Sequence, residues 1–157
     1  MGDESTKQAA QEYLAAKLAE AGRTFEAQEN LEAAIALAPA VWKQFAGTVI
    51  SKCEEWNGVT QEQTLACKEI ALGDLRICCA GNSQQIIVHY DSKKRFVFIK
   101  NSAKPEHEPE TILQIEGYLS DSGRAAHLVR NDLAINVDML ILAQLRILAG
   151  LKSRAEG

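Results

Sequence analysis

The alternation of apolar and polar residues divides the chain into a helical first half and a β-rich second half. Up to about residue 56, apolar residues recur every three or four positions, which is the period of an amphipathic helix. Gly22, Pro39 and the Asn57–Gly58 pair supply helix stop signals within this stretch. The pattern therefore predicts separate helices over residues 4–21, 24–37 and 40–56.

Residues 60–72 fit two structures. Thr60 followed by Gln63 has the spacing of a capping box, which predicts a short helix that ends before Gly73. The apolar residues within 68–72 also fit a strand. Both alternatives are open on the sequence alone.

After Gly73 the hydrophobic period changes to two, which is typical of strands. The tetrapeptide Asp-Ser-Lys-Lys at residues 91–94 joins two β-rich runs and predicts a hairpin. Strands are expected over residues 74–80, 85–90, 95–100, 111–119 and 125–130, and an apolar helix over 132–151. The predicted fold class is α+β, with N-terminal helices, an antiparallel β-meander of four to five strands and a long C-terminal helix.

The domain organisation follows from this change of period. Residues 1–73 form a helical N-terminal region, and residues 74–157 form the antiparallel sheet with the C-terminal helix. A chain of 157 residues is long enough to bury a sizeable core without a metal or a disulfide. The two regions are expected to pack as one unit.

The central hairpin is apolar on both faces. Residue parity assigns Ile86, Val88, Phe96 and Phe98 to one face and Ile87, Val97 and Ile99 to the other. Leaving a large apolar side chain in water forgoes about 1.5–3 kcal/mol. The N-terminal helices are therefore expected to cover one face of the sheet, and the C-terminal helix the other.

The C-terminal helix has no clean polar face. Its polar residues project in scattered directions, so an apolar surface is left over. This predicts a homo-oligomer, in particular a two-fold dimer that uses this helix or the edge of the sheet. The scattered polar residues are Asn136, Asp138, Gln144 and Arg146.

Composition and charge argue against several classes of partner. Seventeen Lys and Arg against 21 Asp and Glu give a net charge of −4, whereas nucleic-acid binding needs a concentrated positive field. Asp138 and Arg146 interrupt the apolar run of residues 133–151, which favours a buried helix over a membrane span. The spacing of the four cysteines matches no metal site, so reduced thiols in a cytoplasmic protein are expected.

Candidate chemistry is sparse. His89 and Asp91 share one face of a strand end, and His127 follows a turn that contains Ser120 and Asp121. Neither group contains a complete metal or nucleophilic site. No catalytic residue, metal or cofactor is therefore predicted, and an enzyme of unknown reaction that uses His89 or His127 is kept as an alternative.

Residues 8–41 have the length of one helical repeat unit. Within this 34-residue stretch, small and apolar residues occupy preferred positions, with Gly22 at the turn: Leu14, Ala15, Gly22, Ala27, Ala34, Ile35, Leu37 and Pro39. The stretch resembles a single tetratricopeptide repeat. The resemblance implies a helical hairpin and a peptide-binding surface.

These observations favour a non-enzymatic protein-interaction, adaptor or chaperone-like protein that acts as a homodimer, with a protein or peptide as a further partner. The alternative is a small-molecule binding or sensing domain with an apolar cavity between sheet and helices. The residues predicted to form the ligand or partner surface are Trp42, Phe45, Trp56, Tyr90, Phe98 and Tyr118.

Overall fold

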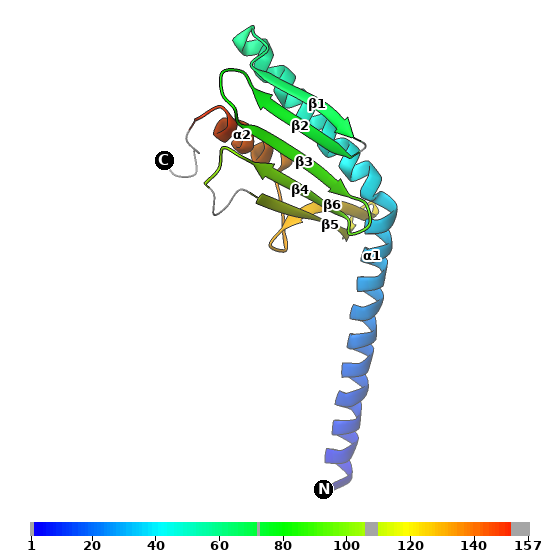
Figure 1. Ribbon diagram of the computed structural model, residues 1–157. Coiled ribbons are helices and arrows are strands. Elements are labelled where there is room, and N and C mark those ends of the chain that lie inside the picture. The colour runs from blue at the N-terminus through cyan, green and yellow to red at the C-terminus, as the bar shows by residue number, and fades with distance from the viewer. Residues whose placement is uncertain (1, 72, 106–109, 152–157) are drawn as a thin grey trace.

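The computed structural model describes residues 2–71, 73–105 and 110–151, and the side chains from residue 5 onward. A single helix, α1 (Gly2–Thr60), takes up 59 residues (Figure 1). The predicted breaks at Gly22 and Pro39 are wrong, and so is the tetratricopeptide-like hairpin, because the turn that it requires is absent. Helix-forming Ala, Leu, Glu and Gln dominate the sequence around Gly22 and Pro39 and outweigh the local cost of these two residues.

Within the described residues after α1, seven strands form one antiparallel sheet in which each strand pairs with its neighbour in sequence. The predicted α+β class and the antiparallel meander are confirmed, but the sheet has seven strands instead of four or five. The strands are β1 (Leu65–Ala71), β2 (Asp74–Cys79), β3 (Gln85–Asp91), β4 (Phe96–Asn101), β5 (Glu110–Ser120), β6 (Gly123–Arg130) and β7 (Leu133–Ala134).

The predicted hairpin between β3 and β4 is also confirmed. Its turn is held by the Asp91 carboxylate, which accepts hydrogen bonds from the backbone N–H groups of Lys93 and Lys94 at 3.0 and 2.9 Å. Asp is favoured in such turns because its short side chain reaches the backbone two and three residues ahead.

β1 settles the two alternatives for residues 60–72 in favour of the strand. The end of α1 and the start of β1 are joined by the side chain of Asn57. Its amide nitrogen donates to the Leu65 carbonyl at 2.7 Å, and its amide oxygen accepts from the Leu65 N–H at 2.9 Å. These two bonds fix how the first strand lies against the last turns of the helix.

The C-terminal helix is shorter than predicted. α2 (Val137–Leu148) has 12 residues, because the preceding residues turn at Asn131 and Asp132, which have φ angles of 52° and 65°, and then form β7. Asn136 caps α2, since its side chain accepts the Met139 N–H at 3.1 Å.

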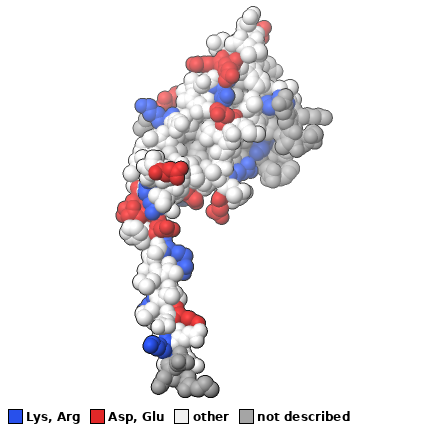
Figure 2. Space-filling model, turned by 180° about the vertical axis from the view of Figure 1, so that it is seen from behind, with Lys and Arg blue, Asp and Glu red and all other residues white. Residues whose placement is uncertain are grey.

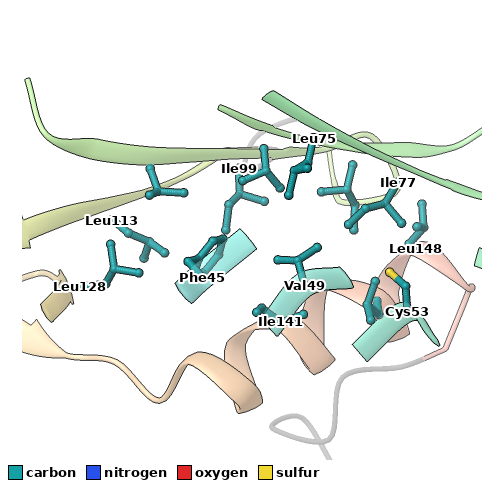
Figure 3. Close-up of a cluster of buried hydrophobic side chains, with 14 of the residues drawn as sticks. Phe45, Val49, Cys53, Leu75, Ile77, Ile99, Leu113, Leu128, Ile141 and Leu148 are labelled. Carbon is teal, nitrogen blue, oxygen red and sulfur yellow. The ribbon is translucent and has the colours of Figure 1, made fainter. Parts of the chain in front are cut away.

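Both helices pack on the same face of the sheet, so the expectation of one helix on each face is wrong. Figure 3 shows the sheet on one side, with Phe45, Val49 and Cys53 of α1 and Ile141 and Leu148 of α2 facing it. Together these side chains close one continuous hydrophobic core between the sheet and the second half of α1.

The pairing of β3 with β4 corrects the predicted assignment of faces. Val88 pairs with Ile99, and Tyr90 pairs with Val97. Since directly paired residues share a face, even-numbered residues of β3 lie beside odd-numbered residues of β4. The buried face therefore contains Ile86, Val88, Val97 and Ile99, and the other face contains Ile87, Phe96 and Phe98.

The second face of the sheet carries the half-buried apolar side chains of Ile87, Phe96 and Phe98. Phe98 lies between His89 and Ile112 in the pairing of β3, β4 and β5. Ile112 is 54% exposed. Among the described residues, no helix packs on this face.

The polar residues of α2 have partners within the chain. Asn101 is fully buried, and its side-chain amide donates to the Gln144 backbone carbonyl at 3.1 Å and to the Gln144 side chain at 3.0 Å. Asp138 lies 3.8 Å from the Lys52 ammonium group. Their scattered positions therefore do not by themselves require a second subunit.

α1 crosses β5 at a glycine. A Cβ atom placed on Gly117 would lie 2.1 Å from the backbone oxygen of Asn30 and 3.0 Å from its Cα. The Asn30 side chain also accepts a hydrogen bond from the Arg124 guanidinium on β6. The absence of a side chain at Gly117 thus permits the close approach that holds α1 to this end of the sheet.

Candidate interaction surface

The first half of α1 projects away from the rest of the molecule (Figure 1). Every described side chain from residue 5 to residue 28 is exposed. Several of them are large and apolar: Leu18 is 74% exposed, Phe25 64% and Tyr13 59%. Viewed from behind, this projecting half is largely white, with separate blue and red groups along it (Figure 2).

The exposed apolar residues follow a heptad repeat. Leu14, Leu18, Ala21 and Phe25 are separated by four, three and four residues, which places them along one seam of the helix. Extended in both directions, the a and d positions of this repeat are Gln11, Leu14, Leu18, Ala21, Phe25, Gln28, Glu32 and Ile35. A seam of this kind is typical of a helix that pairs with another helix.

The side of the projecting helix away from the seam carries charged residues together with Tyr13 and several alanines. Glu12, Arg23 and Glu26 lie away from the seam, and Lys17 flanks it with its ammonium group 5.2 Å from the centre of the Tyr13 ring. Charged side chains therefore gather away from the seam, along a length in which every described side chain is exposed.

Trp42 and Phe45, which were predicted to line a partner surface, face the sheet. Phe45 is only 2% exposed. The Trp42 ring stacks on Phe45 and on Tyr90, with centroid distances of 6.2 and 5.4 Å. Burial raises the pKa of the Tyr90 hydroxyl. In the single chain these three rings are part of the packing between α1 and the sheet.

The remaining predicted surface residues lie in separate places. Phe98 is on the uncovered face of the sheet, and Tyr118 of β5 stacks on the His127 ring of β6 with a centroid distance of 4.2 Å. Trp56 lines a shallow groove of about 410 Å³ between the end of α1 and α2, beside Val59 and Leu142. The structure does not bring these rings together around one cavity.

Two small hollows lie between the sheet and the helices, and the larger, of about 220 Å³, is lined by Val41, Phe45 and Leu128 among others. The space enclosed among Phe45, Val49 and Ile141 is about 10 Å³, roughly the room that a single water molecule needs. The small-molecule alternative stays a prediction.

The two histidines considered for catalysis have different neighbours. The His89 ring contacts the Asp74 carboxylate across β2 and β3 at an exposed position, and His127 stacks on Tyr118. In the part of the chain that the structure describes, no cluster of three or more His, Cys, Asp or Glu side chains could hold a metal ion.

Searches of protein-family models, curated proteins and solved structures found no match to this chain. The surface must therefore be interpreted from its own residues.

α1 also has the length and composition of a helix that could cross a membrane. Within Ser5–Thr60 an apolar stretch of 18 residues has a mean hydropathy of 1.3 and is 28% buried, and core helices of soluble proteins share this length and composition. The two halves of α1 differ in charge and in their contact with the core. Residues 5–30 carry seven charged side chains, whereas the core residues Ala38, Phe45 and Val49 belong to the second half.

Sequence reasoning missed this surface because it divided α1 at Gly22 and Pro39. The signal was present, since the spacing of Leu14, Leu18, Ala21 and Phe25 continues through Gly22 without a change of phase. A heptad template applied across the glycine would have found it.

Proposed function

We propose that this protein is a non-enzymatic interaction protein that acts as a homodimer, and that its two copies pair through the projecting half of α1. The observation that supports the proposal is the exposed heptad seam around Leu18 and Phe25, which makes no contact with its own sheet. An isolated helix in water is only marginally stable, so a projecting helix gains most of its stability from a partner.

A second copy of the chain suits this seam better than a different protein does. The seam contains the neutral amides Gln11 and Gln28, which can donate to and accept from the same residue of an identical helix. Polar residues at single a and d positions also fix the register of helix pairs. Residues 11–28 span about 26 Å of helix, long enough for more than two heptads.

The area available agrees with a dimer of modest affinity. Leu14, Leu18 and Phe25 are between 58% and 74% exposed. Burying six such side chains in a dimer contributes about 6–12 kcal/mol, taking about 1–2 kcal/mol for each partly covered side chain. Association itself costs about 4–15 kcal/mol. The expected dissociation constant is about 1 μM or weaker.

Sedimentation velocity of the full chain over a range of concentrations tests the proposal. The wild-type chain of 17.2 kDa is expected to shift to twice that mass as the concentration passes through the micromolar range. Leu18→Glu places a charge at an a position and is expected to leave the chain monomeric. Ala16→Glu introduces the same charge two residues away, outside the seam, and is expected to dimerise like the wild type.

Other outcomes would overturn the proposal. Wild-type protein that remains a monomer at several hundred micromolar excludes pairing with a second copy. Binding of the monomer to phosphatidylcholine vesicles, lost in Leu18→Glu, would assign the seam to a membrane instead. Equal dimerisation of Leu18→Glu and wild type would place the dimer contact elsewhere on the molecule.

A further inference from the structure

Two of the four cysteines face each other between α1 and β1. The two hydrogen bonds between the Asn57 side chain and the Leu65 backbone, at 2.7 and 2.9 Å, fix the register of the helix against the strand. Cys53 lies one helical turn before Asn57, and Cys67 lies two residues after Leu65.

This register places the two cysteines at about the same distance along the helix from the Asn57–Leu65 contact. Four residues along a helix cover about 6 Å, and two residues along a strand cover about 6.6 Å. Because β1 runs back along the end of α1, both steps lead in the same direction from the Asn57–Leu65 contact. Cys67 also shares the face of Leu65, which is 1% exposed and points into the core.

The environments of the two thiols differ. Cys53 is 3% exposed, while Cys67 is half-buried and packs against the edge of the core. A hydrogen bond between the two side chains, followed by burial, raises the pKa of Cys53. The same hydrogen bond lowers the pKa of Cys67. Cys67 is thus the thiol that ionises first and that solvent reaches.

The other two cysteines are less suited to react with Cys67. Cys78 pairs with Ala66, so its side chain points to the opposite face of the sheet. Cys79 pairs with Leu65 and is diagonal to Cys67 across the strand pair, a separation of about 7–8 Å. A disulfide requires Cα atoms about 4.4–6.8 Å apart, which leaves Cys53 as the partner of Cys67.

We propose that Cys53 and Cys67 form a dithiol site that a low-molecular-weight disulfide oxidises. The Cys67 thiolate attacks one sulfur of the disulfide and releases the first small thiol, which takes up a proton. The Cys53 sulfur then attacks the Cys67 sulfur of this mixed disulfide. The bond between Cys67 and the small molecule breaks, the second small thiol leaves with the proton of Cys53, and the internal disulfide is formed.

The resulting bond would tie the last turns of α1 to the first strand of the sheet. Oxidation is therefore expected to slow amide exchange in β1, where Leu65–Ala71 is an edge strand of the sheet. The site is distant from the heptad seam in sequence, and both cysteines belong to or pack against the core of the folded body. Its oxidation is not expected to change the dimer mass.

The test uses the full chain and glutathione disulfide as the oxidant. After acid quenching, unfolding and alkylation, the wild type is expected to show two alkylated thiols instead of four, with a loss of two hydrogens in intact mass. Peptide mapping is expected to link Cys53 to Cys67. Cys78→Ser, as the matched control, is expected to form the same link, whereas Cys53→Ala is expected to retain a glutathione adduct on Cys67.

Four free thiols in the oxidised wild type, a stable glutathione adduct at Cys67 in the wild type, or a link through Cys78 or Cys79 would each overturn the proposal. The mapping is done on the wild type and does not depend on whether Cys53→Ala folds.

Discussion

Replacing Gly117 with alanine tests the crossing of α1 over β5. The new Cβ would lie 2.1 Å from the Asn30 backbone oxygen and 2.9 Å from its carbonyl carbon. Ordinary contacts of this kind begin at 3.4 Å, so α1 and β5 must separate by roughly 1.3 Å. Since both contacting atoms belong to the helix backbone, no side-chain rotation can relieve the overlap.

The expected cost of this substitution is large for one added methyl group. Inserting a methyl into a tightly packed site costs about 1–3 kcal/mol, and separating two backbones lies at the upper end of that range. The free energy of unfolding from urea titration of Gly117→Ala is therefore expected to fall by about 3 kcal/mol. The hydrogen bond from Arg124 to the Asn30 side chain is expected to weaken with it.

Gly22→Ala is the matched control. Gly22 is in the same helix, is exposed, and has no atom within 4 Å of the position of an added Cβ. Alanine is expected to stabilise α1 by about 0.5–1 kcal/mol there, because glycine is a poor helix former. A Gly117→Ala variant as stable as the wild type would refute the close crossing.

Three further predictions concern the core, a turn and the helix. Asn101→Ala leaves the Gln144 side chain buried without its partner, so the unfolding free energy in urea is expected to fall by about 1–3 kcal/mol; an unchanged value would contradict the contact. The pKa of Asp91 is lowered chiefly because the Lys94 backbone N–H donates a hydrogen bond to its carboxylate. The ionised Asp91 therefore stabilises the folded chain at pH values above its unfolded pKa of about 3.9, and this stabilisation is lost as the pH falls through the lower folded pKa. An NMR titration of Asp91 that gives a pKa above the unfolded value would refute this. Pro39→Ala restores a backbone donor at an exposed position inside α1, and the melting temperature is expected to rise because an interior proline costs about 3 kcal/mol; a fall would show that packing requires the proline.

The antiparallel meander could be predicted because each strand carries its own alternation and each turn its own polar residues. The turn at residues 91–94 is local chemistry, since the Asp91 carboxylate bonds the backbone two and three residues ahead. Such signals need no knowledge of the rest of the molecule. The assignment of residues to the two faces of the sheet did require knowledge of the strand pairing, because the register of Val88 against Ile99 decides which residues of β4 are buried.

The length of α1 could not be predicted from stop signals. Gly22 and Pro39 are unfavourable in a helix, but each cost is local and is offset by many helix-forming neighbours. Tertiary contact adds to this beyond Pro39, where Phe45 and Val49 enter the core. The candidate surface could not be predicted for the same reason, since residues on either side of Gly22 share one side of a helix only if the helix continues through Gly22.

The dependence of amide hydrogen exchange on protein concentration, measured across α1 in the wild-type chain, tests the pairing of its projecting half most directly. Pairing with a second copy predicts that protection of residues 5–28 rises from dilute to concentrated solution, while protection of the buried strands β3 and β4 stays constant. If the protection of residues 5–28 does not change with protein concentration, the result would contradict the pairing of two copies through this part of α1.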